Sequence, residues 1–530
     1  MSQPPASAFG STVVLFFFRA INAVLALAVG VLSASLFGTS IEKDCYLVAQ
    51  TIPMILGTVL VGGLYPTLVV SLTQLRRTEG MAAESAFLRL TLRNLTLLGS
   101  VLLLCAMVFP REMIHLIAPG FDASRVELSA RLFRVSAVGA LVWIYFGTLR
   151  APLESRGRFA PSGACHLVIG CTSLLTLWAL TDRFGIFALA FGPVAGNILG
   201  AVALAWTIVI VTRLPASTPD APINRPLLAQ QQRRLWLSFI PMSVADSVTL
   251  VNIMVDNAFG SYLPAGSIAR LGFAFVIVSN IYLIVTVSLA DVALPRMAAA
   301  ALEGREALRG ILRSGLRHIV LITLPAAFGI VVFGEPIARL LFERGAFQAE
   351  STRGVAHILL CFSPAVVLVG VLALLLRSLF ASRRFGLVGL TSIAAMAANA
   401  GLDWILVGPL GINGIALGTT ITIVLHVSLL LPFVRREVGR IMVRDDAVFL
   451  IKVATSGAVM AGGVLLMTRQ FEAAFDTSRE TVRLLEVLGG CALGAGLYAA
   501  GLLWMRVDEA RALLERSLGF LRRKSGRGAA

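Results

Sequence analysis

The sequence predicts an all-α polytopic membrane protein, because of its composition and because of the length and pattern of its apolar runs. Of the 530 residues, 57% are hydrophobic and only 14% are charged, and the mean hydropathy is +0.86. A soluble protein carries roughly 25% charged residues, so this chain has too few charges to cover a surface that faces water. Disorder requires low hydrophobicity and high charge, and it is excluded as well.

Fourteen apolar runs are long enough to cross a hydrocarbon core about 30 Å thick as helices. They lie at 13–37, 45–72, 88–110, 130–150, 160–181, 185–212, 235–260, 268–294, 317–336, 354–380, 385–408, 412–434, 448–468 and 483–505. Polar and apolar residues do not alternate along them, as they would in the strands of a membrane barrel, so we expect helices. The first run lacks an early basic region and a cleavage site, so we expect it to be retained as a span.

The connections between the runs alternate in charge, and this pattern predicts the orientation of the chain. The formal net charge is +16, from 45 Lys and Arg against 29 Asp and Glu. Arginines gather in every second connection and in the C-terminal tail, whereas intervening connections such as 472–480 are richer in acids. The positive-inside rule then places both termini in the cytoplasm. The excess of positive charge reflects membrane orientation, and no nucleic-acid partner is expected.

The proline-rich segment 213–234 separates six spans from eight, as in transporters built from two related halves. The stretches 109–124 and 333–351 look alike and favour a duplication. We therefore expect two pseudo-related six-helix lobes followed by two further helices. The expected divisions are an N-terminal lobe 1–212, a cytoplasmic linker 213–234, a C-terminal lobe 235–436, spans thirteen and fourteen within 437–510, and a basic cytoplasmic tail 511–530.

No enzyme motif can be found in the sequence. It contains no P-loop, no HExxH and no nucleophile elbow, and its six cysteines form no CxxC pair. We therefore expect no catalytic residue, no metal site and no cofactor. Transport by this chain would be driven by an ion gradient, by the membrane potential or by the gradient of the substrate.

Ionisable and polar residues inside the apolar runs are the candidates for a functional site, because burying a charge at membrane depth is unfavourable by at least ~2.5–3.5 kcal/mol. The candidates for a coupling ion or proton are Asp246, Asp291, Asp403 and His426. The candidates for the substrate or its cavity are Arg19, Asn252, Asp256 and Arg377.

Each of these residues also has a purely structural interpretation. Arg19 and Arg377 lie near expected cytoplasmic ends of helices, where long cationic side chains reach the interface. Asp246 could make a polar contact between helices, and His426 could be a hydrogen-bonded packing residue. Asn252 and Asp256, four residues apart, share one helix face.

Several segments carry a resemblance to a known family. "EPIARLLFERGAFQAEST" (335–352) and "SLFGTSIEKDCYLVAQTIP" (35–53) closely resemble the MurJ/MviN family of lipid II flippases. Segments 118–123, 157–161, 185–192, 252–271 and 294–297 match in the same order, and 399–421 also resembles the wider multidrug/oligosaccharidyl-lipid/polysaccharide exporter superfamily. The residues to which the resemblance assigns a structural role are Phe37, Gly38, Glu42, Asp44, Pro53, Glu335, Pro336, Arg344 and Gly345. We expect Glu42 and Asp44 to cap a helix N-terminus.

The sequence departs from the family at its cavity arginines, which are thought to bind the lipid-linked pyrophosphate. The family's first span usually reads Ser-Arg-x-x-Gly-x-x-Arg-Asp, and those places hold Asn22, Ala23, Ala26, Val29 and Gly30, so the two arginines are replaced by Ala23 and Val29. Thr51 stands at the second-span position, and 272–276 replaces the eighth-span motif. Arg19 lies one turn before Ala23, so it could supply a replacement charge on the same helix face.

The resemblance implies a flippase that moves an undecaprenyl-diphosphate-linked saccharide across the bacterial inner membrane by alternating access. Spans thirteen and fourteen would form a groove for the lipid tail. The partners implied are the lipid-linked saccharide and membrane lipids, with proteins of cell-wall or polysaccharide synthesis as further candidates. The alternatives are a flippase for exopolysaccharide or O-antigen repeat units, an ion-coupled drug or metabolite antiporter, a polytopic glycosyltransferase, and a scaffold that does not transport.

Overall fold

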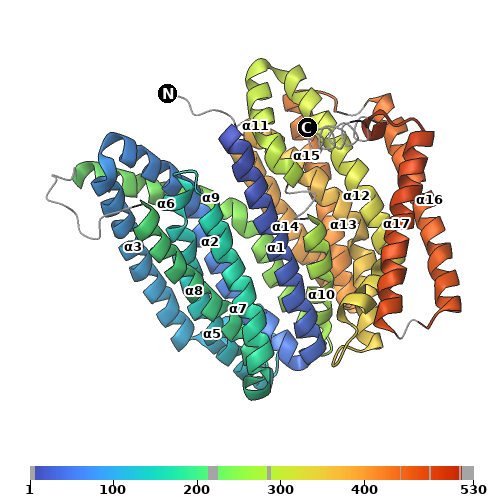
Figure 1. Cartoon of the computed structure of the whole chain (residues 1–530), viewed down its shortest axis with the longest axis horizontal. Coiled ribbons are helices and arrows are strands. Elements are labelled where there is room, and N and C mark those ends of the chain that lie inside the picture. The colour runs from blue at the N-terminus through green and yellow to red at the C-terminus, as the bar shows by residue number, and fades with distance from the viewer. Residues whose placement is uncertain are drawn as a thin grey trace, which may run out of the picture. The chain divides into compact units, whose positions relative to one another are not determined.

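A computed structural model describes residues 6–212, 225–282, 288–382, 384–441, 443–476, 479–511 and 515. All regular structure within these ranges is helical, which confirms the predicted fold class (Figure 1). Twelve helices among the described residues are long and apolar enough to cross a membrane. The expected spans 235–260 and 268–294 are not among those twelve, so the count of fourteen stays a prediction.

The helices form two compact units. Unit 1 comprises Met1–Ala269 and Arg344–Phe347, and unit 2 comprises Arg270–Glu343 and Gln348–Ala530. The boundary at Ala269 falls inside a helix, and residues 213–224 of the expected linker lie outside the described ranges, so the expected lobe divisions stay a prediction.

Nine helices are described in the first part of the chain and eight in the second. The first set is α1 (Ala6–Phe37), α2 (Ile41–Thr78), α3 (Gly80–Val108), α4 (Pro110–Ile117), α5 (Ala123–Leu149), α6 (Ala151–Glu154), α7 (Ala160–Phe184), α8 (Phe187–Thr212) and α9 (Arg225–Gly260). The second set is α10 (Ser267–Ile281), α11 (Ser288–Glu303), α12 (Arg305–Phe342), α13 (Ala349–Ala381), α14 (Phe385–Leu410), α15 (Ile412–Val438), α16 (Arg444–Ala474) and α17 (Glu480–Trp504).

Helix α2 is central to unit 1, because it packs against α3, α5 and α9. Leucines at intervals of four residues form one buried stripe along it: Leu60, Leu64, Leu68 and Leu72. Residues at this spacing lie one above another on a single helix face. The stripe contacts apolar side chains of α3 and α9, among them Phe87 and Leu235. The other end of α2 belongs to a second buried cluster with α4, α5 and α8.

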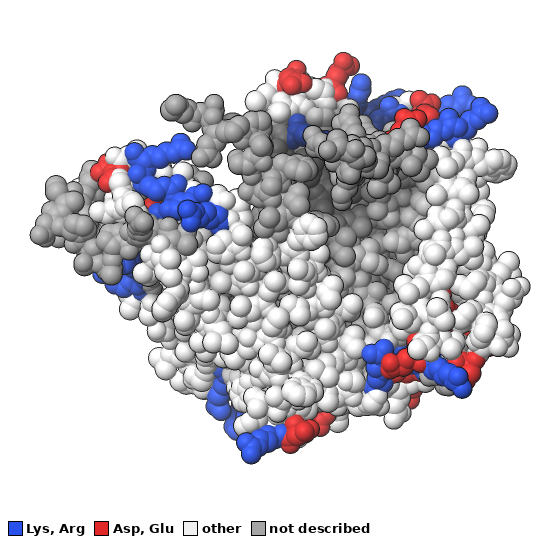
Figure 2. Space-filling model, viewed as in Figure 1, with Lys and Arg blue, Asp and Glu red and all other residues white. Residues whose placement is uncertain are grey.

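The surface between the helix ends is almost free of charge on the face shown in Figure 2. Large apolar side chains of the described helices are exposed rather than buried. Trp178, Trp206 and Trp404 are 70%, 70% and 73% exposed, respectively. Exposed apolar surface of this extent would be unstable in water and is what a hydrocarbon environment requires. The low charge content of the sequence is therefore explained by the surface that faces lipid.

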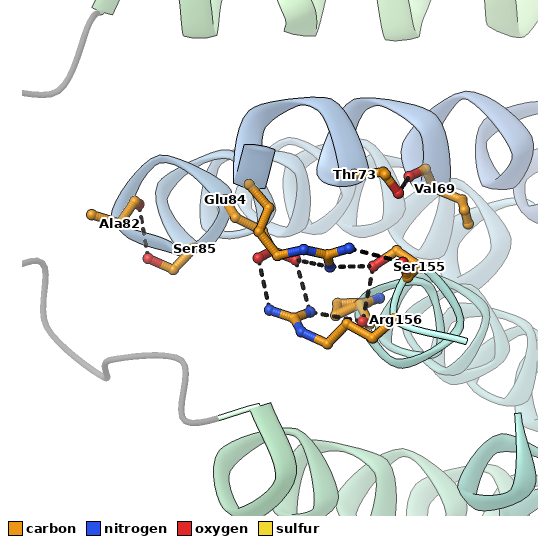
Figure 3. Close-up of polar contacts among 9 residues, drawn as sticks. Val69, Thr73, Ala82, Glu84, Ser85, Ser155 and Arg156 are labelled. Atoms are coloured by element: carbon orange, nitrogen blue, oxygen red, sulfur yellow. Dashed lines mark hydrogen bonds and ion pairs between the residues drawn. The ribbon is translucent and has the colours of Figure 1, made fainter. Parts of the chain in front are cut away.

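A buried carboxylate joins three elements at one end of unit 1. The side chain of Glu84 in α3 is fully buried, and its two oxygens accept hydrogen bonds of 2.8 and 2.7 Å from the Arg156 guanidinium (Figure 3). Arg76, in the last turn of α2, lies 3.5 Å from the same carboxylate and also donates to the Ser155 carbonyl oxygen at 2.9 Å. The ion pair thus ties α2 and α3 to the turn that follows α6.

Replacing Glu84 by Ala is expected to lower the free energy of unfolding by about 3–5 kcal/mol, because two arginines would remain without their buried counter-charge. Glu127→Ala is the control, since Glu127 pairs with the exposed Arg111 and exposed pairs contribute about 0–1 kcal/mol. Thermal unfolding of both variants in lipid nanodiscs would measure the difference. Equal melting temperatures would contradict a stabilising role for Glu84.

Candidate functional site

The turn between α1 and α2 is held by backbone contacts that only glycine permits. Gly38 has φ +52°, and a Cβ at this position would lie 2.3 Å from the Ala346 carbonyl oxygen. Gly345 has φ +54°, and its Cβ would lie 2.3 Å from the Ser35 carbonyl oxygen. The Ala346 amide donates to that same Ser35 oxygen at 2.8 Å. The segment Arg344–Phe347 therefore packs directly on the α1–α2 turn, and we call this contact the junction.

Asp44 extends the junction to the start of α10. Its side chain is 2% exposed, and its two oxygens accept hydrogen bonds from the backbone amides of Gly266 at 2.6 Å and Ala269 at 2.7 Å. A carboxylate at this place satisfies amides at a helix N-terminus and interacts favourably with the helix dipole. Asp44 thus caps a helix more than 200 residues away in sequence, whereas α2 itself is capped by Ser40.

The loop between α4 and α5 makes a further close contact in unit 1. The Gly120 amide donates to Ser261 Oγ at 2.9 Å, and a Cβ on Gly120 would lie 2.8 Å from the Ser261 backbone. Asp122, next in this loop, caps α5 by accepting from the Arg125 amide at 2.9 Å. That hydrogen bond holds the pKa of the Asp122 carboxyl below its usual value.

Across the ranges that the structure describes, the remaining family-motif residues make no close backbone contact of the kind seen at the junction. Glu42 is exposed, and Pro53 is buried within α2. In unit 2, Glu335 pairs with Arg339 at 2.8 Å, and Pro336 is buried within α12. In unit 1, Arg344 lies at one edge of an apolar groove of about 610 Å³ between α1 and α7.

Thr51 stands at the second-span position where the family resemblance places a cavity arginine. Its side chain is uncharged and hydrogen-bonded to another helix. Thr51 Oγ1 accepts a hydrogen bond of 2.8 Å from Asn257 Nδ2, and both residues are buried. On the same helix as Asn257, Asn252 and Asp256 are half-buried. Uncharged hydrogen bonding between α2 and α9 therefore replaces the expected positive charge at Thr51.

Unit 1 also contains a cavity of about 350 Å³, and its lining residues Met54 and Thr58 are exposed. It lies between α2, α5 and α8, and its lining includes Gln50, Ser136, Trp143 and Asn197. The sequence provided no signal for this site, because uncharged polar residues within apolar runs are common and do not stand out. Its geometry makes it the candidate site for a small neutral ligand.

In unit 2, Asp403 is the candidate that the structure places deepest. Its side chain in α14 is 0% exposed, and Asn399 Nδ2 donates to its Oδ2 at 2.9 Å. A Cβ on Gly418 of α15 would lie 2.6 Å from its Oδ1, so the two helices approach closely at the carboxylate. A buried carboxylate beside an amide can take up a proton or a cation.

The other predicted residues lie on helices other than α14. His426 is 7% exposed in α15, and its Nε2 has no hydrogen-bond partner among the described residues. Arg377 is half-buried in α13 and reaches the Ala373 carbonyl oxygen at 3.5 Å. The backbones at Arg19, Asp246 and Asp291 lie in α1, α9 and α11, but their side chains fall outside the described residues. The described part of the chain holds no group of three or more His, Cys, Asp or Glu residues that could bind a metal ion.

Taken together, the apolar helices and the lipid-facing surface define a polytopic membrane protein. The sequence model for "Lipid II flippase MurJ" matches residues 33–486. The chain therefore belongs to the lipid II flippase MurJ family, which confirms the resemblance seen in its motifs.

Individual relatives agree with this assignment. A probable lipid II flippase MurJ of Thermotoga maritima is 25% identical over 454 residues, covering 84% of this chain and 88% of the relative. One from Vibrio cholerae is 22% identical over 503 residues, covering 92% and 94%.

Solved structures agree with the fold. A lipid II flippase MurJ in an inward closed conformation matches with a TM-score of 0.75 and 21% identity, over 95% of this chain and 100% of that one. An inward-facing multidrug resistance MATE family transporter matches with a TM-score of 0.66 and 15% identity, over 78% and 94%.

Replacing Gly38 by Ala is expected to unfold or strongly destabilise the junction. The new Cβ would clash with the Ala346 backbone, and alanine is also strained at the positive φ of this position. Gly185→Ala is the matched control, since Gly185 has φ +54° and nothing within 4 Å of its Cβ position. The control should lose only about 1–2 kcal/mol from its φ, whereas overpacking adds about 1–3 kcal/mol or more at Gly38. Thermal unfolding in nanodiscs measures both, and equal losses would show that the contact with Ala346 is unimportant.

Proposed function

We propose that this chain translocates an undecaprenyl-diphosphate-linked saccharide of the lipid II type across the bacterial inner membrane. The observation that carries the proposal is the family match over residues 33–486. The close packing of the family-motif residues Gly38, Asp44 and Gly345 supports it. Both termini would lie in the cytoplasm, as the arginine-rich connections indicate. The chain would act as a transporter and catalyse no covalent step.

The mechanism proposed is alternating access, in which the units move relative to one another while a cavity changes the side to which it opens. The neutral Thr51–Asn257 pair means that the diphosphate would be bound by groups other than an arginine at that position. Arg19 in the first span is the cation that we assign to this role. Spans thirteen and fourteen, now α16 and α17, would hold the lipid tail.

Growth of cells depleted of their own lipid II flippase tests the substrate. Expression of this chain should restore growth and peptidoglycan synthesis, with immunoblotting of membrane fractions as the control for its amount. Failure to restore growth at normal expression would contradict lipid II transport. It would instead favour a repeat unit of exopolysaccharide or O-antigen as the carried saccharide.

We further propose that Asp403 binds the coupling proton or cation. A fully buried carboxylate in a membrane helix is unfavourable unless it is neutralised, and uptake of a proton or cation would neutralise it. Because α14 and α15 approach closely at this carboxylate, a change in its charge would directly alter how the two helices pack.

Replacing Asp403 by Asn is expected to reduce transport at least tenfold while preserving the fold, because Asn keeps the shape and can accept from Asn399. Translocation of a fluorescent lipid-linked saccharide in proteoliposomes, with and without an imposed proton or sodium gradient, is the measurement. Glu350→Gln is the control, because the Glu350 side chain is 87% exposed. An Asp403→Asn variant that still responds to the gradient would contradict the assignment.

A further inference from the structure

The cavity between α2, α5 and α8 of unit 1 has a lining without charge. Its fourteen lining residues include no Asp, Glu, Lys or Arg. A charged group placed there would find no counter-charge in the lining, which makes its partial desolvation unfavourable. The lining therefore offers nothing that favours the diphosphate of a lipid carrier or a free metal ion. The ligand that fits is neutral.

Two buried polar atoms in the lining have no partner within the described part of the chain. They are Ser136 Oγ and Asn197 Oδ1, and each residue is only 6% exposed. Asn197 Nδ2 donates to the Gly139 carbonyl oxygen at 3.2 Å, which holds the amide in place between α8 and α5. An unmade hydrogen bond of this kind destabilises a buried site. Both atoms would be satisfied by a ligand that offers hydroxyl or amide N–H groups.

The indole of Trp143 gives the cavity an aromatic surface beside its polar atoms. Trp143 stacks on Phe146 with ring centroids 5.5 Å apart and 18° between the planes. The His166 ring lies nearly perpendicular to the Trp143 ring, with ring centroids 5.8 Å apart. The α2 backbone also touches it, because a Cβ on Gly57 would lie 3.0 Å from Trp143 Cδ1. The indole is thus held in one orientation. Rigid aromatic surface beside a few fixed polar atoms is the usual lining of a small-molecule site.

Entry to the cavity is possible at α2, where the lining residues Met54 and Thr58 are exposed. Farther along the same helix, Gln50 Nε2 donates to the Tyr46 hydroxyl, and this hydroxyl donates to the Leu189 carbonyl oxygen at 3.3 Å. A volume of about 350 Å³ is at the lower end of the range of about 300–1,000 Å³ for small-molecule sites. It has room for one sugar ring and its substituents, but not for a whole glycan.

We propose that this cavity is a subsite for one uncharged sugar ring of the lipid-linked saccharide. The apolar face of the ring would lie on Trp143, and its hydroxyl or acetamido groups would donate to Asn197 and exchange hydrogen bonds with Ser136. The inference rests on the proposed function, because it assigns the saccharide and not the diphosphate to this site. It predicts that the protein distinguishes a glycosylated carrier from a bare one through unit 1.

Binding of two probes to the full-length protein in lipid nanodiscs tests the proposal. The probes are undecaprenyl diphosphate and the same lipid carrying its disaccharide-pentapeptide, as in lipid II. The wild-type protein should bind the glycosylated probe roughly tenfold more tightly, as two neutral hydrogen bonds would allow. The double variant Ser136→Ala/Asn197→Leu should lose most of this preference and keep its affinity for the bare carrier.

The matched control is Ser129→Ala combined with Thr207→Val. Ser129 lies two turns before Ser136 on α5, is also buried, and does not line the cavity. Thr207 lies on α8 like Asn197, donates to the Ala203 carbonyl oxygen at 2.7 Å, and does not line the cavity. The control should keep the full preference. Met54→Trp at the exposed mouth should abolish the preference by blocking entry, even if the double variant fails to fold.

The outcomes separate the two proposals. A wild-type protein that binds both probes equally, or a Met54→Trp variant with unchanged preference, would overturn the sugar subsite and leave a water-filled cavity. The proposed flippase function would stand in that case. Binding of neither probe by the wild-type protein would overturn the proposed function, and the sugar subsite with it.

Discussion

The close backbone contact around the α1–α2 turn is the constraint on which the architecture of unit 1 depends. Gly38, Gly266 and Gly345 all have positive φ, and a Cβ on any of them would lie 2.3 Å from a carbonyl oxygen. Three chain segments that are distant in sequence can meet there only because none carries a side chain at the contact. Asp44 completes the junction by supplying the acceptors that the first amides of α10 need. Because Asp44 is buried, water could not take its place as the acceptor for these amides.

Charge is used in different ways in different parts of unit 1. Where the carboxylate of Glu84 is buried, two arginines surround it, and the ion pair joins helices. Where a family arginine would be expected, Thr51 and Asn257 form a neutral hydrogen bond. The cavity between α2, α5 and α8 is lined by uncharged residues as well. This distribution separates a neutral recognition surface from the cationic group that a diphosphate needs, so the two parts of a lipid-linked saccharide would be bound at different places.

Much of the fold could be predicted from the sequence, because a membrane imposes simple rules on composition and length. Apolar runs predicted the helices, and the motifs at 35–53 and 335–352 predicted the family that the comparison confirms. The sites were harder to predict. Asp403 was recognised because a carboxylate in an apolar run is rare, whereas Ser136 and Asn197 were missed because neutral polar residues are common in such runs. They stand out only in the packed structure, where Ser136 Oγ and Asn197 Oδ1 have no hydrogen-bond partner among the described residues.

The sequence by itself determined the all-helical class, the lipid-facing surface and the family, since these depend on local composition and on motifs that can be read along the chain. Tertiary structure decided that Asp44 caps α10, that Arg344–Phe347 packs on the first turn, and that a neutral cavity lies between α2, α5 and α8. The physical reason is that these features depend on distances between residues far apart in sequence. Hydrogen-bond partners, close backbone approaches and cavities come into being only when the helices pack.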